Sequence, residues 1–499
     1  MILINPQKGR RIQLGAFASY VPLNVPFGIG FLSGYLLMKG KAVTVVDEEV
    51  TPLTVDMLEN YVRKTHVPHI FGISCLTANI NRGLEIARLI RELYPSSTII
   101  MGGIHPTVLP DEVVKSGLVD IVVRNEGEVT LYRLYEAVKE GRDYRDIPGI
   151  SYLEGGDAVH RGAAPLVDMG ELPLFPYHIF ERHRRRYNFG FLTSSRGCPF
   201  DCIFCSQRAI TGRSYRFMKT EKVIETIDLM VNKYGERYIV FSDDNFAVHK
   251  KRMADICDAI VEHGFSKKAA FMCQCRGDAI NDEALDYLKR ANFNGISFGI
   301  ESGSDRILDV IKKAEKVEDN VNGIMLAKKR GFKVSGTYIL GLPTETRQER
   351  LMSYRMAKKL DLDYVRFNNA TPYPGTELYE IAKREGGLNT GENWANLNAC
   401  AVLIGGSKTE VPYVPNTCTK EELLSDVFWF NVCYTLRPAR VWKFLFDKTT
   451  DTAGWIQLPD KWWLKWGEWK TLIKVGSGFF AQIARMTVYS LKVKTGVSR

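Results

Sequence analysis

The sequence Ser194-Ser-Arg-Gly-Cys-Pro-Phe-Asp-Cys-Ile-Phe-Cys205 contains three cysteines in a C-x3-C-x2-C pattern. Three thiolates so close on one loop can ligate three irons of a four-iron, four-sulfur cluster, which leaves the fourth iron open to a small molecule. A structural zinc site usually has four ligands, often as two cysteine pairs, and the ten cysteines of this chain form no second C-x2-C pattern. Zinc and unrelated core cysteines are the alternative interpretations.

This loop follows the first of six predicted strand–helix units. Six such units favour an incomplete barrel, and the active sites of barrels lie at the C-terminal ends of the strands. The three-cysteine loop is therefore predicted at the catalytic face. The strands are predicted to start near Phe191, Tyr238, Ala269, Gly295, Lys333 and Tyr364, with helices at 221–234, 252–263, 283–291 and 348–360.

The N-terminal part also alternates short β-branched runs with amphipathic stretches, for example at 70–74, 81–93 and 98–103. This alternation predicts an α/β fold with a doubly wound parallel sheet, which binds ligands beyond the carboxyl ends of its strands. The G-x-G-x-x-G fingerprint is missing after the first strand, so NAD is disfavoured. The candidate ligand-binding residues at these ends are Ser74, Thr77, Gly102, Gly103, His105, Pro106 and Glu126.

Size and composition indicate a multidomain globular protein of 499 residues, 45% of them apolar and 25% charged. The N-terminus lacks the features of a signal peptide, and no uncharged apolar run is long enough to cross a bilayer, so we expect a cytoplasmic protein with reduced thiols. The predicted domains are 1–140, a linker at 141–190 that contains the basic run Arg182–Arg186, the barrel at 191–385 and a mainly helical region at 386–499.

Four further motifs follow the cysteine loop, each near a predicted strand end: Phe241-Ser-Asp-Asp-Asn-Phe246, Gly299-Ile-Glu-Ser-Gly-Ser304, Ile339-Leu-Gly-Leu-Pro-Thr-Glu345 and Thr371-Pro-Tyr-Pro-Gly-Thr-Glu377. Together with the loop, they resemble the motifs of radical S-adenosylmethionine (SAM) enzymes. The N-terminal Gly-Gly-Ile-His-Pro-Thr and Glu-Gly-Glu sequences are similar to the signature of the large class with a cobalamin-binding domain. The resemblance covers about residues 1 to 385.

The resemblance implies that Cys198, Cys202 and Cys205 ligate a [4Fe-4S] cluster whose open iron binds the amino and carboxylate groups of SAM. Reductive cleavage of SAM would then give a 5′-deoxyadenosyl radical. Two adjacent aspartates on a strand point to opposite faces, so only one is expected to face the site. The alternative to SAM binding is core packing for Phe204 and an ion pair for Arg276 and Glu301. The residues implied for SAM are Phe204, Asp243, Asp244, Arg276, Glu301, Gly341, Leu342 and Pro343.

For cobalamin, the resemblance implies that His105 lines the corrin and does not ligate cobalt, because the chain has no Asp-x-His-x-x-Gly motif. The lower face of the corrin would then be covered by residues 74–78. An N-terminal domain that keeps the fold but binds no cobalamin is the alternative.

Two types of reaction fit this class. The favoured one is C-methylation of an unactivated carbon; the alternative is radical cyclisation, rearrangement or oxidation, as in the anaerobic cyclases of bacteriochlorophyll synthesis. A non-catalytic cobalamin sensor is a third hypothesis. Cys273 and Cys275 share one face of a predicted strand and are expected in the core, with a radical-quenching thiol as the alternative. The electron donor would be a flavodoxin or a ferredoxin.

The C-terminal region differs in composition from the rest of the chain. From Arg437 onward there are 12 Lys and Arg against 4 Asp and Glu, and seven of the eight tryptophans lie in the last 71 residues. Such a mixture favours a membrane interface, so residues from about 415 onward are predicted to contact the inner face of the membrane or to cover a hydrophobic substrate. Packing of this region on the barrel is the alternative, and nucleic-acid binding is disfavoured.

Overall fold

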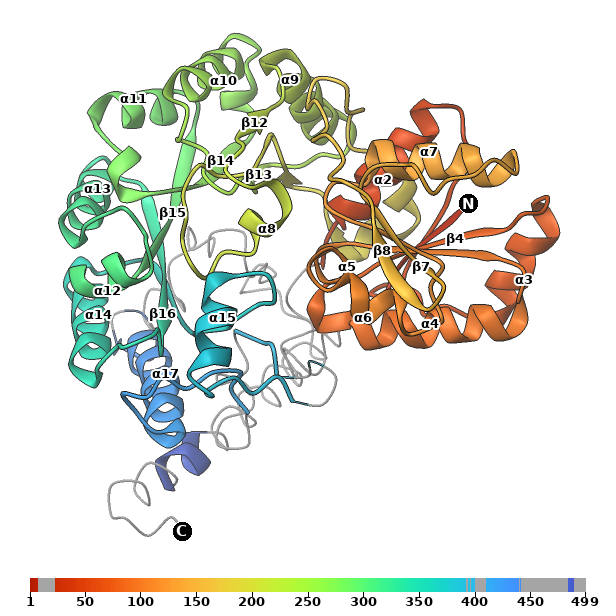
Figure 1. Ribbon diagram of the computed structural model, residues 1–499. Coiled ribbons are helices and arrows are strands. Elements are labelled where there is room, and N and C mark those ends of the chain that lie inside the picture. Colours follow the sequence, from red (N-terminus) through yellow and green to blue (C-terminus); the bar gives the residue numbers. More distant parts are fainter. Residues whose placement is uncertain are drawn as a thin grey trace.

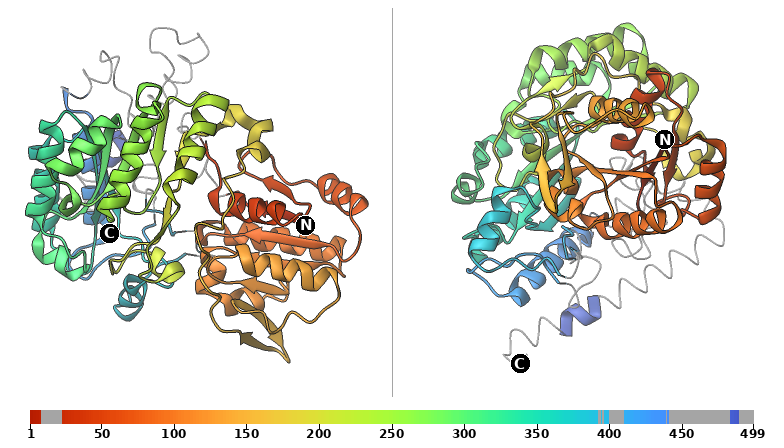
Figure 2. Two further views of the ribbon diagram at one scale, coloured as in Figure 1. Left: turned by 90° about the horizontal axis from the view of Figure 1, so that it is seen from above. Right: turned by 45° about the vertical axis from the view of Figure 1, so that its right-hand side comes forward.

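The structure is a computed structural model, and it describes residues 1–7, 23–391, 394, 396–399, 410–438, 440 and 483–488. Two sheets, each covered by helices, form two parts that lie side by side (Figure 1). The view from above in Figure 2 shows the same arrangement, with the N-terminal sheet beside the second, curved sheet. The predicted α/β architecture is confirmed.

The N-terminal sheet has seven strands in the order β3-β1-β4-β5-β6-β7-β8, and the first five in this order are parallel. Helices α2 and α7 pack on one face, while α3, α4 and α6 pack on the other, as expected for a doubly wound sheet. The strands are β1 Ile2–Asn5, β3 Thr44–Asp47, β4 Ile70–Ser74, β5 Thr98–Gly102, β6 Ile121–Val123, β7 Ile150–Glu154 and β8 Asp157–His160; the helices are α2 Phe27–Met38, α3 Val55–Lys64, α4 Ile80–Leu93, α5 Ile104–Val108, α6 Pro110–Val114 and α7 Glu128–Lys139.

Strands β7 and β8 correct part of the predicted linker. They form an antiparallel hairpin that extends the sheet beyond β6. The turn is Gly155-Gly156, and both glycines have positive φ, 61° and 93°. A two-residue turn with two positive φ angles matches the twist of a hairpin, which is why glycine is favoured there. This glycine pair, which lies within the predicted linker, therefore closes a hairpin.

The second sheet contains six parallel strands in chain order, with helices on its outer side, which is the predicted partial barrel. All six strands begin within two residues of the predicted positions. The strands are β10 Phe191–Leu192, β13 Tyr238–Phe241, β14 Ala270–Cys275, β15 Phe293–Glu301, β16 Lys333–Leu340 and β17 Tyr364–Asn369; the outer helices are α9 Thr220–Asp228, α10 Lys250–Glu262, α11 Asp282–Arg290, α12 Asp305–Val310, α13 Val317–Lys329 and α14 Arg347–Leu360.

The two cysteines of β14 face the helical layer. The Sγ atoms of Cys273 and Cys275 are 3.7 Å apart, and both residues are buried in the core that also contains Cys257 of α10. Because side chains alternate along a strand, the intervening Gln274 points to the inner side of the barrel. Both thiols are thus core residues, and neither faces the barrel interior.

Helix α17, Lys420–Thr435, packs against the edge strand β17 and against α14. Its side chains are buried on several sides, from Leu423 to Tyr434. The Asn431 side-chain amide accepts a hydrogen bond from the Phe367 N–H at 3.0 Å and donates one to the Phe367 carbonyl at 2.8 Å. One side chain thereby satisfies two backbone groups that an edge strand would leave unpaired.

The aromatic and basic stretch Lys461–Lys470 of this C-terminal region lies outside the described residues. Residues 483–488 are described; they are helical, and Met486 is buried against the main core. Within the described part of the chain, no helix is long and apolar enough to span a bilayer.

Candidate active site

The three cysteines lie on the loop that follows β10 and the short strand β11, Ser195–Arg196. Strand β11 pairs with β12, Arg216–Phe217, and helix α8, Gln207–Thr211, begins two residues after Cys205. The loop is anchored at Ile203, whose N–H donates to the Ile311 carbonyl at 3.1 Å and whose carbonyl accepts from the Leu378 N–H at 2.9 Å. The loop therefore sits at the carboxyl ends of the strands, as predicted.

All three thiols are free and partly buried, and burial raises the pKa of each, that of Cys202 to about 11. Cys202 and Cys205 line a surface cavity of about 450 Å³. Among the described residues, no three His, Cys, Asp or Glu side chains are close enough to bind a single metal ion. Three free thiols on one loop suit a multi-iron cluster, whereas a structural zinc site usually has four ligands.

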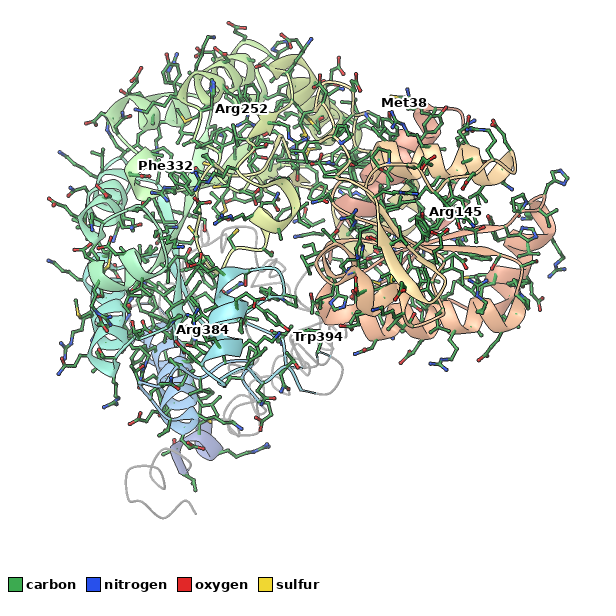
Figure 3. All side chains as sticks on the ribbon, viewed as in Figure 1. Met38, Arg145, Arg252, Phe332, Arg384 and Trp394 are labelled. Atoms are coloured by element: carbon green, nitrogen blue, oxygen red, sulfur yellow. The ribbon has the colours of Figure 1, made fainter. Side chains whose placement is uncertain are left out.

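Asp243 anchors the start of the cysteine loop. Its Oδ1 accepts hydrogen bonds from the N–H groups of Ser194 at 2.7 Å and Ser195 at 3.1 Å. The Arg252 guanidinium lies 2.9 Å from its Oδ2, and both side chains are buried. Arg252 comes from α10 (Figure 3), is buried, and also contacts the Ser194 hydroxyl. The Asp243 carboxylate is thus fully engaged by the protein.

Asp244 has the opposite orientation, as expected for neighbouring residues. Its Oδ2 accepts a hydrogen bond from the Gly197 N–H at 3.2 Å, directly before Cys198. Burial raises the pKa of Asp244, and the neighbouring Asp243 raises it further. Of the two carboxylates, Asp244 is the one beside the cysteines.

Arg276, one of the residues predicted for SAM, is bound by other groups of the protein. Its Nη1 and Nη2 donate to the carbonyls of Lys313 and Ala314, each at 2.6 Å, and its Nη2 lies 2.7 Å from Oδ2 of Asp278. The guanidinium also stacks over the Phe200 ring at 3.7 Å. Arg276 therefore ties the loop after α12 to the cysteine loop.

That loop positions Lys313, a residue that the sequence analysis missed. Lys312 and Ala314 both have positive φ, 52° and 51°, and this tight turn directs Lys313 inward while Lys312 pairs with Glu377 outside. The Lys313 ammonium is buried near Cys202 and Cys198 and opposes the rise of their pKa values. In the sequence, Lys313 is one of several lysines, and spacing gives no signal that separates it from its neighbours.

Glu301 ends β15 at an irregularity of the β15–β16 pairing and has φ +67°. A positive φ is costly for a residue with a long side chain, and such strain concentrates at functional sites. Its Oε1 lies 3.6 Å from the Lys313 ammonium. Burial raises the pKa of Glu301, and the charge of Lys313 only partly opposes this rise.

Gly341 has φ +80°, and a Cβ there would lie 2.8 Å from a methyl group of Leu423 in α17. The N–H groups of Gly341 and Leu342 donate to Oε2 of Glu345 at 2.6 and 3.3 Å, while Oε1 is buried without a partner. Burial raises the pKa of Glu345 to about 8. Two features therefore favour glycine at position 341: its positive φ and the close approach of α17.

The remaining residues predicted for SAM pack around the cysteine loop. Leu342 is fully buried in a cluster with Ile203, and Phe204 lies partly buried against the same cluster. Pro343 is also buried. These side chains form the apolar support of the loop.

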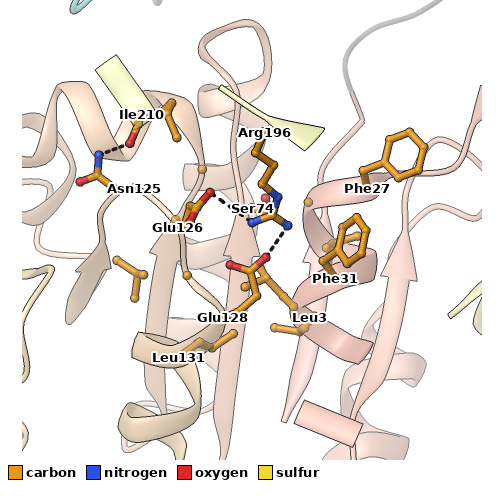
Figure 4. A pocket seen from close by; sticks show the side chains of 18 of the residues that line it. Leu3, Phe27, Phe31, Ser74, Asn125, Glu126, Glu128, Leu131, Arg196 and Ile210 are labelled. Atoms are coloured by element: carbon orange, nitrogen blue, oxygen red, sulfur yellow. Dashed lines mark hydrogen bonds and ion pairs between the residues drawn. The ribbon is translucent and has the colours of Figure 1, made fainter. Parts of the chain in front are cut away.

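In the N-terminal part, Ser74, Gly102 and Gly103 line a cavity of about 240 Å³ whose walls are mostly apolar (Figure 4). Gly103 has φ +103°, and a Cβ at this position would lie 2.3 Å from the Cys75 carbonyl oxygen. Residues from the barrel, Arg196 and Ile210 among them, complete the walls. An apolar cavity lined in part by glycines suits an organic ligand whose surface approaches the backbone.

Of the other residues predicted for cobalamin, Thr77, His105 and Pro106 do not line this cavity, and Glu126 lines it but forms an ion pair within the protein. Thr77 and Pro106 are buried at the starts of short helices. His105 is buried; its ring contacts Trp394, and its Nε2 lies 3.5 Å from Oε1 of Glu112. Trp394 lies toward the N-terminal part (Figure 3) and donates to Glu112 at 3.0 Å. Glu126 lines the cavity, but its carboxylate pairs with Arg216 at 2.6 Å.

Known proteins share this architecture and these motifs. Residues 15–135 match the B12 binding domain family, and residues 192–357 match the Radical SAM superfamily. An uncharacterized methyltransferase of Pyrococcus horikoshii is 33% identical over 362 residues, which are 72% of this chain and 78% of that protein. The anaerobic magnesium-protoporphyrin IX monomethyl ester cyclase of Rubrivivax gelatinosus is 27% identical over 371 residues, 71% of this chain and 66% of that protein.

Among solved structures, the methyltransferase TsrM from Kitasatospora setae, with cobalamin and a [4Fe-4S] cluster bound, matches with a TM-score of 0.70 at 18% identity. The match covers 88% of this chain and 91% of that one. The chain belongs to the radical SAM enzymes with a B12-binding domain. It is therefore an enzyme whose cofactors are a [4Fe-4S] cluster, SAM and cobalamin.

Proposed function

We propose that the enzyme is a cobalamin-dependent methyltransferase that methylates an unactivated carbon of a small-molecule or lipid substrate. The observation that carries this proposal is the cavity of about 240 Å³, because Gly102 and Gly103 of the N-terminal sheet and Arg196, two residues before Cys198, line the same space. A proposed cobalamin site whose wall includes a residue next to the cysteine loop favours chemistry that uses both cofactors. When bound, the cluster supplies the electron that cleaves SAM to a radical, and cobalamin supplies the methyl group.

In this proposal Cys198, Cys202 and Cys205 ligate the cluster, and Asp243 with Arg252 fixes the start of their loop. Asp244 and Glu301 face the SAM site. In this proposal Lys313 binds the SAM carboxylate. Among the described residues beside the cysteines, its ammonium is the cation whose nearest carboxylate oxygens, at 3.6 and 3.8 Å, lie beyond hydrogen-bonding distance. Ser74, Gly102 and Gly103 contact cobalamin.

The test needs no substrate. The cobalamin-loaded protein, reduced and mixed with SAM labelled in its methyl group, is expected to give labelled cobalamin and an equal amount of S-adenosylhomocysteine. Label that stays in SAM, while the same preparation still forms 5′-deoxyadenosine, contradicts methyl transfer.

That second outcome supports radical cyclisation, the alternative function. The observation that favours it is the 27% identity to the Rubrivivax cyclase across both parts of the chain. Under this alternative cobalamin has no methyl group to transfer, so the two functions predict opposite results in the same experiment.

The proposal also includes two partners, an electron-donor protein and a membrane surface. A flavodoxin or ferredoxin would supply the electron. Contact of the C-terminal region with a membrane is proposed only for residues outside α17, because α17 packs on the barrel. Deletion of residues 441–499 tests this: if the full chain floats with liposomes of anionic lipid and the shortened chain does not, the proposal is supported. Equal flotation of the two chains, or no flotation of either, contradicts it.

A further inference from the structure

The turn after β6, Asn125–Glu128, contacts both ends of the three-cysteine loop. Asn125 Nδ2 donates to the carbonyls of Ile210 at 2.8 Å and Ala209 at 3.3 Å, in the helix that follows Cys205. Glu128 Oε1 accepts from Arg196 Nη2 at 2.7 Å, two residues before Cys198. Figure 4 shows the contacts of Asn125 with Ile210 and of Glu128 with Arg196. We call this turn, together with Arg196 and Arg216, the clasp.

The clasp explains an unusual pairing in the hairpin β11–β12. Arg196 and Arg216 lie directly opposite each other, and like charges at such positions repel. The two glutamates neutralise them: Arg216 binds both oxygens of Glu126, at 2.6 and 2.9 Å, while Arg196 binds Glu128 and lies 3.3 Å from Glu126. Burial acts to raise the pKa of Glu126, but the two arginines lower it overall. The hairpin that carries the cysteines therefore depends on acidic residues of the N-terminal part.

The clasp is also a wall of the cavity of about 240 Å³, which Asn125, Glu126, Glu128 and Arg196 all line. Among these cavity-lining residues, Glu128 has a buried atom without a hydrogen-bond partner, its Oε2. Unsatisfied buried polar atoms are costly, so a ligand that pairs with them gains affinity. Cobalamin carries amide groups that can donate to a carboxylate, and the residues present thus fit it.

We propose that the clasp couples the two cofactor sites, so that cobalamin in the cavity fixes the position of the cysteine loop, and the assembled cluster in turn strengthens cobalamin binding. Linkage requires this effect to be equal in both directions. The inference rests on the two cofactors of the proposed function and not on methyl transfer.

The test compares the affinity of hydroxocobalamin for the full chain with and without its reconstituted cluster. Coupling between sites is typically about 5- to 150-fold, and we expect the cluster-loaded protein to bind at least about 5-fold more tightly. The electron paramagnetic resonance signal of the reduced cluster is expected to shift when hydroxocobalamin is added. Equal affinities together with an unchanged signal overturn the proposal.

The variant Asn125→Gly removes only the hydrogen bonds to α8, because glycine accepts the φ of +63° at this position without strain. We expect it to bind both cofactors with less than half of the wild-type coupling factor. The matched control is Asn292→Gly, at φ +64°, whose Nδ2 donates to the Ala269 carbonyl between the starts of β14 and β15. It should keep the full coupling.

Arg196→Met is a stronger variant that should remove the coupling and the shift of the cluster signal. Coupling that is unchanged in both Asn125→Gly and Arg196→Met contradicts the clasp. Because neither measurement needs turnover, an enzyme that proves to be a cyclase would still show the coupling, so failure of the clasp and failure of the proposed methyl transfer are distinguishable.

Discussion

The ammonium of Lys313 lies 3.6 Å from Oε1 of Glu301, at the carboxyl end of β15 and beside the cysteine loop. Oε2 of Glu315 is 3.8 Å away, and the Lys313 side chain is only 7% exposed. Both distances are longer than a hydrogen bond, so the ammonium can still bind an anion. Arg276 occupies its own donors with backbone carbonyls and Asp278, so of these two cations near the cysteines Lys313 is the one that we propose for the SAM carboxylate.

Lys313→Met should weaken SAM binding to the cluster-loaded protein by roughly 10- to 100-fold, because hydrogen bonds to charged groups contribute about 1.5–3 kcal/mol. Decarboxylated SAM should bind the variant and the wild type alike. Lys312→Met is the matched control, since the Lys312 side chain is exposed and pairs with Glu377. Equal losses for both ligands, or no loss for SAM, would show that Lys313 does not bind the carboxylate.

Arg252→Met should destabilise the protein by about 3–5 kcal/mol, because it leaves the buried Asp243 carboxylate without its partner. Iron content after reconstitution should fall as well, since Asp243 orders Ser194 and Ser195 before the cysteines. Arg290→Met, which breaks an exposed pair with Asp258, should change stability by less than about 1 kcal/mol. Urea unfolding and iron analysis decide; normal iron loading in a folded Arg252→Met protein would count against the anchor.

The pKa of Glu345, raised by burial from 4.5 to about 8, predicts a pH dependence of stability. Between these values the folded chain keeps a proton that the unfolded chain releases, so the contribution of Glu345 to stability falls as pH rises and is constant above about 8. Glu345→Gln should match the wild type in Tm at pH 5 and exceed it at pH 9. A constant difference in Tm across this range would mean that the carboxyl has an ordinary pKa.

Gly103→Ala should abolish cobalamin binding, because Gly103 lines the cavity and its Cβ would lie 2.3 Å from the Cys75 carbonyl oxygen, so the backbone there must shift. Gly117→Ala is the control: its φ is also positive, +70°, but nothing lies within 4 Å of the added Cβ, so only about 1–2 kcal/mol of backbone strain is expected. The absorbance of hydroxocobalamin that stays with the protein after gel filtration measures the difference. Equal retention by both variants would place the cofactor elsewhere.

The strands were predictable because buried parallel strands are short β-branched runs between helices, and the run Ile70–Ser74 begins and ends in the structure where the sequence predicts it. The hairpin of Gly155 and Gly156 was missed because a glycine pair suits both a linker and a tight turn. Contacts between distant residues were beyond the sequence: nothing near Asn431 indicates that it pairs with Phe367.

The site shows the same limit. The cysteine spacing predicts the loop, and alternation along a strand predicts that Asp243 and Asp244 point apart. The motif containing Glu126 indicates a ligand at the end of β6, but its partner Arg216 is 90 residues away. Lys313 points inward because of the two positive φ angles beside it, at Lys312 and Ala314, where neither residue is a glycine that would mark the turn.

The most direct test of the account is the formation of 5′-deoxyadenosine by the anaerobically reconstituted protein with SAM and a reductant. The account predicts that the wild type forms it and that Cys202→Ala, which removes one of the three proposed cluster ligands, does not. No 5′-deoxyadenosine from cluster-loaded wild type, or an undiminished amount from Cys202→Ala, would contradict the assignment of this loop as the radical SAM centre.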